Sequence, residues 1–398
     1  MGACIQNRIK QHNLDHSLTR AFYTSPDIYL LDLERYWGRN WLFAGHVSQI
    51  PNVGDFFLFD FGNESVIISR DEDDTISAYL NVCRHRGSRI CLESHGNKRT
   101  FTCPYHAWTY NLKGDLIWAG HMSKSFKSNN FSLKSVNLIN FQGLIFICLT
   151  DNPPSIAPTL EKLAPLTRPF ALEQLKIVHS ASYPVAANWK LALENYMECY
   201  HCAPSHKEYS KSHSLKDPGE MEALIPSLNI RSEAAGLLIG EINSTGPTST
   251  DIGTDCYYRR YPLFSGYDTV SNNGQPLAPL LGSLASYDGG ASDLQIGSLN
   301  NFLIYSDHVI AYRFIPTGLQ TTEIQTFWLV RGDAEEGKDY VLDDLTWLWH
   351  VTTLDDERII RHNQQGVNSF YYRPGPLSSM EFGVSEFHHG YLTMLAQE

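Results

Sequence analysis

Long hydrophobic runs are missing from this sequence. The most apolar stretch covers residues 141–149 and has the length of a β-strand, whereas a membrane-spanning helix needs about 18 or more apolar residues. The N-terminal residues are polar and lack a signal-peptide core, and Gln6 stands where a myristoylation signal has Ser or Thr. We therefore predict a cytoplasmic protein that does not bind membranes.

Positive charge is also scarce. Lys and Arg number 31 against 43 Asp and Glu, which gives a net charge of −12. Nucleic acids and anionic lipids bind basic surfaces, so neither is an expected partner. The Gly-x-Gly-x-x-Gly signature of dinucleotide-binding folds is absent, which indicates that this chain does not take electrons directly from NAD(P)H. Eight cysteines in 398 residues are too few for a disulfide scaffold.

The pattern of apolar residues divides the chain into three parts. Residues 1–40 contain a predicted helix over 25–37, with a Ser-Pro start that is typical of a helix N-terminus. Residues 41–152 show short apolar runs separated by Gly and Pro, which predicts a small antiparallel β domain. A proline cluster then marks a boundary, and residues 153–398 mix helices with strands.

Within the third part, a few segments have a clear period. Residues 188–200 predict a helix, whereas 309–314 and 323–330 predict strands. Residues 232–300 are rich in Gly, Ser and Asn and have no clear period, so we interpret them as long loops, one of which is a candidate lid.

Two short motifs in the β domain pair cysteine with histidine, Cys83-Arg-His85 and Cys103-Pro-Tyr-His106. A structural zinc site uses two Cys and two His in tetrahedral geometry. A Rieske [2Fe–2S] cluster places two thiolates on one iron and two imidazoles on the other. Each loop here supplies one Cys and one His, as two loops that clamp a two-iron cluster require. Unliganded Cys and His in a protein core are the third alternative.

A second group of metal-binding residue types follows in the helix predicted over 188–200. Asn195, Glu198 and His201 are three residues apart, which places them on one helix face. Pro204 should loosen the helix, so that His206 lies beside His201. Two histidines and a carboxylate form the facial triad of mononuclear Fe(II) oxygenases.

Two cysteines within this second group offer an alternative. Cys199 and Cys202 would form a zinc site together with the two histidines. We interpret both as buried small apolar residues, because thiolate ligands would fill the positions that O2 needs. The carboxylate ligand must then come from elsewhere, and Asp355 and Asp356, at the predicted start of an acidic helix, are the candidates.

These motifs resemble a known family. Cys-x-His-Arg-Gly followed by Cys-Pro-Tyr-His-x-Trp-x-Tyr resembles the cluster domain of Rieske non-heme iron oxygenases, and also Rieske ferredoxins. The second half resembles the catalytic domain of the oxygenase α subunits, and the resemblance covers about residues 35–390. It implies an α+β fold, with a small antiparallel-β Rieske [2Fe–2S] domain at 41–152 and a helix-grip catalytic domain with a curved antiparallel sheet at 153–398, on which 1–40 packs.

The resemblance also implies ligands for two metal groups. The cluster would be held by Cys83, His85, Cys103 and His106, and the Fe(II) by His201, His206 and Asp356. In the family the late Asp precedes a Gln-x-Gly segment, and the spacing to Gln364 and Gly366 favours Asp356 over Asp355. Adjacent helix residues point about 100° apart, so only one of the two should reach the iron.

Glu198 takes a particular role in this resemblance. The family carboxylate three residues before the first iron histidine bridges to a cluster histidine across a subunit boundary. Glu198 would thus link His201 to His106 of a neighbouring chain in a homotrimer. Most relatives have Asp here, and Glu matches the branch that acts on carnitine, choline and betaines. Asn195 would support the iron site, or act only as a hydrogen-bonding residue of the helix face.

Three hypotheses of function follow. The first is the oxygenase component of a Rieske system that hydroxylates, and so N-dealkylates, a quaternary or tertiary amine such as a betaine. Its electrons come from NAD(P)H through a separate flavoprotein reductase. The second is a dioxygenase or demethylase of an aromatic compound. The third is a non-catalytic redox or zinc-binding protein. Glu198 and the many tyrosines of the second half, which offer cation–π contacts, favour the first.

Overall fold

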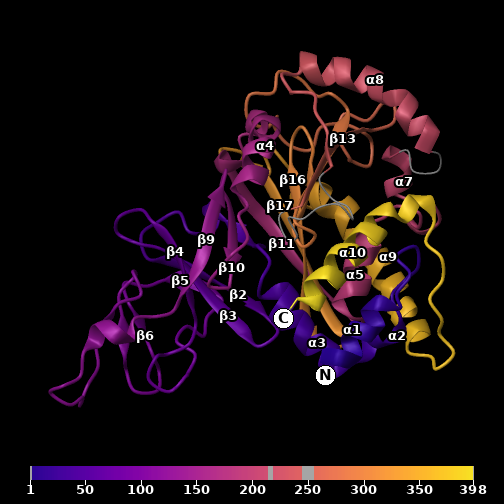
Figure 1. The fold of residues 1–398 in the computed structure, drawn as a ribbon. Coiled ribbons are helices and arrows are strands. Elements are labelled where there is room, and N and C mark those ends of the chain that lie inside the picture. The colour runs from indigo at the N-terminus through magenta and orange to yellow at the C-terminus, as the bar shows by residue number, and fades with distance from the viewer. Residues whose placement is uncertain (1, 214–217, 244–254, 398) are drawn as a thin grey trace. The chain divides into compact units, whose positions relative to one another are not determined.

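The chain forms two compact units, as the computed structural model shows (Figure 1). One is Leu42–Pro153, and the other combines Met1–Trp41 with Pro154–Glu398. The residues that the structure describes are 2–213, 218–243 and 255–397. A bilayer-spanning helix, which must combine length with apolar character, is not found in this described part of the chain.

The unit Leu42–Pro153 consists of two antiparallel sheets. The larger has the strand order β1-β10-β9-β4-β3-β2-β5, and the smaller has the order β6-β7-β8. The strands are β1 (Leu42–His46), β2 (Asp55–Phe61), β3 (Glu64–Arg70), β4 (Ile76–Leu80), β5 (His95–Asn97), β6 (Phe101–Thr102), β7 (Thr109–Tyr110), β8 (Leu116–Trp118), β9 (Ser135–Phe141) and β10 (Leu144–Cys148). Two short 3-10 helices, η2 (Val47–Gln49) and η3 (Ser128–Phe131), complete the unit.

Aromatic residues join the two sheets of this unit. Phe56 of β2 and Phe101 of β6 pack edge to face, with ring centroids 5.9 Å apart. Both belong to a buried core that also contains Trp108 and Tyr110 from the small sheet and its loop. Burial of each large apolar side chain contributes about 1.5–3 kcal/mol, so this core fixes the small sheet on the large one. The loop between β6 and β7, which carries Cys103 and His106, is therefore held in place.

The second unit is built on one curved antiparallel sheet, with the order β11-β17-β16-β15-β14-β13-β12. Its strands are β11 (Leu175–Val185), β12 (Ile242–Asn243), β13 (Cys256–Pro262), β14 (Gly290–Ile296), β15 (Asn301–Ile304), β16 (Val309–Gly318) and β17 (Thr321–Arg331). The fold class predicted from the sequence, α+β with this sheet and a separate small β domain, is confirmed.

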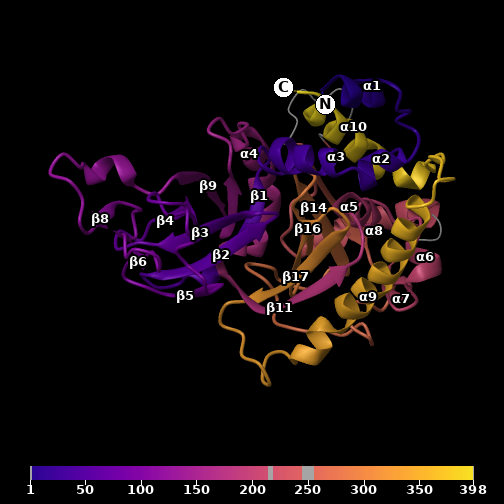
Figure 2. The same ribbon diagram turned by 90° about the horizontal axis from the view of Figure 1, so that it is seen from below.

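Helices from distant parts of the chain pack with this sheet. The helices are α1 (Gly2–Lys10), α2 (Arg20–Thr24), α3 (Pro26–Leu31), η1 (Asp32–Trp37), α4 (Ala157–Thr167), η4 (Arg168–Phe170), η5 (Leu172–Gln174), α5 (Trp189–Tyr196), α6 (Cys202–Ser205), α7 (Tyr209–Ser212), α8 (Pro218–Ala234), α9 (Leu342–Val367), η6 (Ser379–Glu381) and α10 (Phe382–Ala396). The long helix α9 lies against β11 and α5 (Figure 2). The N-terminal segment packs on the same unit, where α1 and η1 contact α10.

A buried ion pair fixes α5 to the N-terminal segment. The Lys190 ammonium on α5 pairs with the Asp32 carboxylate on η1, and both side chains are fully buried. The Tyr391 hydroxyl of α10 donates to Asp32 Oδ1 at 2.6 Å. Removal of one partner of such a pair costs about 3–5 kcal/mol, because it leaves a buried charge without compensation. The helix that leads into the second candidate metal site is therefore rigidly placed.

The helix expected over 25–37 is confirmed at both ends, with Ser25 as its N-cap, and consists of α3 followed by the π-helix η1. Two other secondary-structure predictions were wrong at one end. The helix expected over 188–200 ends at Tyr196, and a turn replaces its last part. The acidic pair expected at a helix start lies in the middle of α9, which begins at Leu342. In each case tertiary packing overrides a local signal that is only a weak indicator.

The prediction of long loops over 232–300 was wrong in part. This range contains the strands β13 and β14, which lie next to each other in the sheet, between β15 and β12. The Gly- and Ser-rich connections on either side of these strands hid the alternation of fully and partly buried residues. Residues 244–254, on which part of that prediction falls, lie outside the described residues.

Candidate metal centres

Two loops of similar geometry carry the cysteines and histidines of the β domain. The N–H of Gly87 donates to the Cys83 carbonyl, and the N–H of Ala107 donates to the Cys103 carbonyl, at 2.9 and 3.0 Å. Gly87 and Ala107 both have a positive φ, of 80° and 57°, which closes each turn tightly. Each loop thus forms a compact turn with cysteine at its base and histidine near its tip.

The four side chains differ in how deeply they are buried. Cys83 and Cys103 are buried, with 3% and 2% exposure, whereas His85 and His106 are exposed. The two imidazole rings lie with centroids 4.6 Å apart, and Trp108 stacks on the His85 ring. Two inner thiols and two outer imidazoles are the donor set of a Rieske cluster, whose inner iron binds sulfur and outer iron nitrogen.

The Cys83 thiol is buried and also lies next to a tyrosine hydroxyl. Its sulfur lies 3.4 Å from the Tyr110 hydroxyl, which also accepts the N–H of Arg84. Burial raises the pKa of the Cys83 thiol, so that a thiolate is held there only when a cation binds it. The residues present therefore fit an iron–sulfur cluster.

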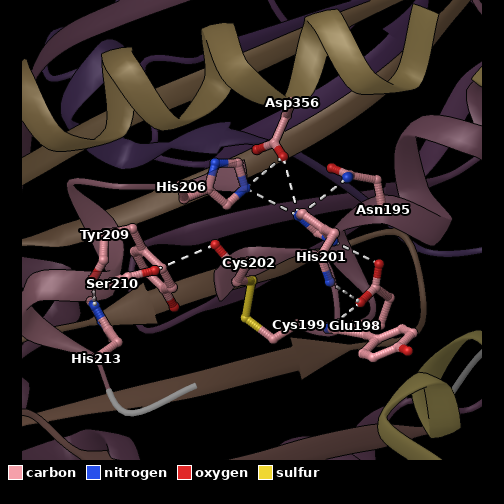
Figure 3. The surroundings of a disulfide bond; sticks show 11 residues. Asn195, Glu198, Cys199, His201, Cys202, His206, Tyr209, Ser210, His213 and Asp356 are labelled. Atoms are coloured by element: carbon pink, nitrogen blue, oxygen red, sulfur yellow. Dashed lines mark hydrogen bonds and ion pairs between the residues drawn. A yellow bond between two sulfur atoms is a disulfide. The ribbon is translucent and has the colours of Figure 1, made fainter. Parts of the chain in front are cut away.

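The second candidate centre lies after the end of α5, in the turn that precedes α6. The Asn188 side chain caps α5 by accepting the N–H of Lys190 at 3.1 Å. Past the helix, the Glu198 carboxylate accepts the backbone N–H of Tyr200 and of His201. Its Oε1 also lies 2.6 Å from Nδ1 of His201 (Figure 3). Glu198 thus shapes the turn and sets the direction of the His201 ring.

Three donor atoms converge at this turn. Nε2 of His201 and Nε2 of His206 are 3.1 Å apart. Oδ1 of Asp356, from α9, lies 3.0 Å from the His206 nitrogen and 3.4 Å from the His201 nitrogen (Figure 3). Ligands with metal bonds of about 2.1 Å at right angles lie about 3.0 Å from one another. The spacing of the three atoms therefore fits a metal ion held on one face, with other positions open.

The two neighbouring aspartates contact different atoms of His206. Asp356 faces Nε2, whereas Oδ2 of Asp355 lies 3.7 Å from Nδ1, on the other side of the ring. Asp355 also pairs with Arg358 and is 40% exposed, against 20% for Asp356. Ligating histidines commonly present their second nitrogen to a carboxylate, which is the position of Asp355.

Asn195 lies at the same centre. Its amide nitrogen is 3.3 Å from Nε2 of His201, so α5 contributes a polar group next to the converging atoms. Helical spacing does not explain this, because the helix ends before Glu198. The turn that follows Tyr196 brings Asn195, Glu198 and His201 together instead.

Neighbouring polar groups shift the pKa values of His201 and Asp356 at this centre. Burial acts to lower the pKa of His201, but hydrogen bonds with Asp356 and Glu198 outweigh it and raise the pKa to about 9. Burial likewise acts to raise the pKa of Asp356, yet the hydrogen bonds from His201 and His206 lower it. A proton shared among these groups takes the place that a metal cation fills, and metal binding displaces it.

The interpretation of Cys199 and Cys202 as free apolar residues was wrong. The two form a disulfide (Figure 3). The turn brings their Cα atoms to 4.9 Å, inside the range that a disulfide spans. The Cys202 sulfur lies within 4.8 Å of the donor nitrogens of His201 and His206, but its bond to Cys199 removes it as a thiolate ligand. Asp356 is the better third donor.

A cavity of about 580 Å³ opens beside the three donor atoms. Its lining includes the aromatic residues Tyr196, Tyr209, Tyr261, Tyr305, Trp349 and Phe382. It also includes Asp293 on β14, which the sequence reasoning missed because that strand was interpreted as loop. The alternation of Asp293 and Gln295 with the apolar Leu294 and Ile296 was the signal that could have found it.

The first domain has the donor set of a Rieske cluster, and the second domain has a His-His-Asp centre. This combination is typical of an iron-dependent oxygenase. Residues 40–137 match the family model of the Rieske [2Fe-2S] domain. Residues 172–229 and 299–397 match that of the ring hydroxylating alpha subunit (catalytic domain).

Curated relatives and solved structures agree with these matches. The glycine betaine monooxygenase oxygenase subunit of Chromohalobacter salexigens is 34% identical, over 98% of this chain and 88% of the relative. The carnitine monooxygenase oxygenase subunit of Escherichia coli is 32% identical over 49% of this chain and 54% of its own. The fold matches the quaternary ammonium Rieske monooxygenase CntA in complex with L-carnitine, with a TM-score of 0.71, 21% identity, and coverage of 96% and 97% of the two chains.

The chain therefore belongs to the Rieske oxygenase α subunits, the family of ring-hydroxylating oxygenases. It is an oxidoreductase that uses O2. Membership implies a Rieske cluster in the first domain and a mononuclear iron in the second. The alternatives of a zinc protein and of a non-catalytic redox protein are thereby set aside.

The cluster assignment leads to a spectroscopic prediction. Cys83→Ser is expected to yield a colourless β domain, with acid-labile sulfide reduced to background, because an inner ligand is lost. Cys91→Ala is the matched control, since Cys91 is buried in the same core and burial raises the pKa of its thiol to about 11. Visible absorption and sulfide analysis check both variants. A Cys83→Ser protein that keeps a full cluster would contradict the assignment.

Proposed function

We propose that this protein is a monooxygenase component that hydroxylates an N-methyl group of a small quaternary ammonium compound such as glycine betaine. O2, two electrons and two protons convert N–CH3 into N–CH2OH and release one water. The carbinolamine then loses the hydroxyl proton as its C–N bond breaks, which gives a tertiary amine and formaldehyde. The net result is oxidative N-demethylation.

One observation carries this proposal. The glycine betaine monooxygenase subunit is similar over almost the whole chain, so the matched length covers the segments that line the cavity as well as the metal motifs. The cavity, about 580 Å³ with aromatic walls, suits a small ligand with a trimethylammonium group. Such groups bind against aromatic faces through cation–π attraction.

Residue roles follow from the geometry. In the Rieske domain, residues 41–152, the cluster ligands are Cys83, His85, Cys103 and His106. In the catalytic domain, residues 153–398 with the N-terminal segment 1–40 packed on it, the iron ligands are His201, His206 and Asp356. When bound, this iron activates O2 for insertion into a C–H bond. Asn195 holds its amide beside the iron position, supported by its 3.3 Å approach to Nε2 of His201.

The electrons come from a separate protein in this proposal. The sequence has no dinucleotide-binding signature, and the relatives are named as oxygenase subunits, which suits a chain that receives electrons from a partner. The partner is a flavoprotein reductase that oxidises NAD(P)H. Both proteins work in the cytoplasm, where this reductant is available, and cell fractionation tests that placement.

Glu198 connects the two metal groups across a homotrimer. Its Oε1 lies 2.6 Å from Nδ1 of His201, which supplies one end of a bridge. His106 is exposed, and an imidazole bound to a cluster keeps one N–H for an outer partner. His106 of a neighbouring copy therefore donates its free ring N–H to Glu198, which would hold a cluster-ligand histidine and an iron-ligand histidine together across the subunit boundary.

Formaldehyde release tests the reaction. The holoenzyme with a reductase is expected to release formaldehyde from glycine betaine or a close analogue, in amounts that match the tertiary amine formed and O2 consumed. A panel of betaines, carnitine, choline and aromatic acids identifies the substrate. Hydroxylation of an aromatic acid with no formaldehyde from any amine would overturn the proposal in favour of an aromatic-ring hydroxylase.

A further inference from the structure

A carboxylate that has no role in metal binding faces the cavity. Asp293 lies in the middle of β14, where Ala291, Asp293 and Gln295 line the cavity. The alternate residues Leu294 and Ile296 are buried on the opposite face of the sheet. Because side chains alternate along a strand, the position of Asp293 toward the cavity is fixed by the register of the whole sheet.

This carboxylate forms no ion pair within the described part of the chain, although Arg259 lines the same cavity. Its Oδ1 is buried and has no hydrogen-bond partner among the residues that the structure describes. Gln295, on the same face of β14, is the hydrogen-bonding neighbour of the carboxyl group. A buried carboxylate without a cation is costly, and burial raises the pKa of Asp293 to about 7. The site is therefore one that a ligand cation would stabilise.

The cation opposite Asp293 is already engaged. Arg259 is its partner in the β13–β14 register. The Arg259 guanidinium donates to both carboxylate oxygens of Glu222, at 2.8 and 2.9 Å, and its Nε lies 3.6 Å from Glu241. Two carboxylates thus neutralise this arginine, and its positive charge is not available to Asp293.

Aromatic rings surround the carboxylate. Burial raises the pKa of several phenols here, and the negative charge of Asp293 raises it further, which places that charge within electrostatic reach of Tyr196, Tyr209, Tyr257, Tyr261 and Tyr305. Tyr209 and Tyr305 also pack with Trp349, at centroid distances of 5.6 and 6.3 Å. Rings of this kind attract a cation through their faces.

We infer that Asp293 is the counter-charge for the ammonium group of the substrate and makes the cavity selective for a positive nitrogen over a neutral group of the same shape. This inference rests on the proposed function and adds a specificity-determining residue to it. The aromatic walls supply shape and cation–π attraction, and the full negative charge of Asp293 adds a stronger preference for a cationic nitrogen over a neutral carbon.

A pair of matched ligands tests the inference. Glycine betaine and 3,3-dimethylbutanoate have the same shape and carboxylate, and differ in that a neutral carbon replaces the cationic nitrogen. We expect the wild-type holoenzyme to bind glycine betaine about 10- to 100-fold more tightly than the isostere, as measured by calorimetry. Asp293→Asn should remove most of this difference by weakening betaine binding while leaving isostere binding unchanged. Asp293→Glu, which keeps the charge, should retain a preference for betaine.

The outcomes separate charge recognition from a structural role. Iron content and cluster absorption of Asp293→Asn report whether the fold is intact. Equal weakening of both ligands, or no weakening of betaine, would overturn the inference. If that variant does not fold, Asp293→Ala replaces it with the same expected outcomes, and a wild-type preference below about twofold also overturns the inference.

Ligand binding tests the role of Asp293, and formaldehyde release tests the proposed reaction, so the two can fail separately. Asp293-dependent binding of glycine betaine without formaldehyde release would refute the proposed reaction and leave the inference standing. Formaldehyde release with equal KM in wild type and Asp293→Asn would support the reaction and refute the inference.

Discussion

Asp356→Ala is expected to lower the rate of substrate turnover by more than about a thousandfold, while the cluster spectrum stays that of the wild type. Oδ1 of Asp356 is the one carboxylate oxygen that lies within 3.4 Å of both imidazole nitrogens in the described structure. Without it, two neutral imidazoles from a single turn remain, and they bind Fe(II) weakly. Iron analysis should fall from about three to about two per chain, since the cluster iron is held elsewhere.

Asp355→Asn is the matched control for this result. Asp355 is the neighbouring carboxylate on α9, and it approaches the far nitrogen of His206 at 3.7 Å. Loss of an outer partner weakens metal binding by about tenfold at most when that partner is half exposed. If Asp355→Asn emptied the iron site and Asp356→Ala did not, the choice of the third ligand would be wrong.

Glu198→Gln is expected to lower turnover by about a hundredfold or more while both metals and the oligomer remain. Glutamine keeps the size of Glu198 and one oxygen to accept the N–H of His201, so the turn should persist. It loses the negative charge that faces Nδ1 of His201 and that, in the proposed homotrimer, would accept the ring N–H of His106 from a neighbouring copy. Electron transfer to the iron should therefore become slower, whereas substrate binding should be unchanged.

Single-turnover kinetics and mass photometry separate these effects. Reduction of the iron after rapid mixing with reduced reductase should be slow in the Glu198→Gln variant, although a trimer and full iron content are measured. Glu208→Gln is the control, because Glu208 pairs with Lys211 on the surface just past His206. Unchanged electron-transfer rates, or a wild-type monomer that is fully active at nanomolar dilution, would refute the bridge.

The cluster motifs could be predicted from the sequence because their geometry is local. Cys83 and His85 share one tight turn, as do Cys103 and His106, and Gly87 allows the positive φ that closes the first of them. Residues within four positions of one another have few arrangements available, so spacing alone indicates which side chains meet. The same reasoning paired His201 with His206, although a turn and a short helix, not a continuous helix, bring them together.

Tertiary structure alone decided the remaining features of the site. Asp356 faces the imidazoles because α9 packs on α5 and β11, whereas the spacing to Gln364 and Gly366 favoured it over Asp355 only through the family resemblance. The Cys199–Cys202 disulfide depends on where α5 ends, which its buried contacts determine. Asp293 faces the cavity through the register of β14 with its neighbours. The sequence by itself determined the family and the metal-binding motifs, since these depend on short-range turn geometry. The cavity and its charge depend on contacts between segments far apart in the chain, and their relative positions are set only when the core packs.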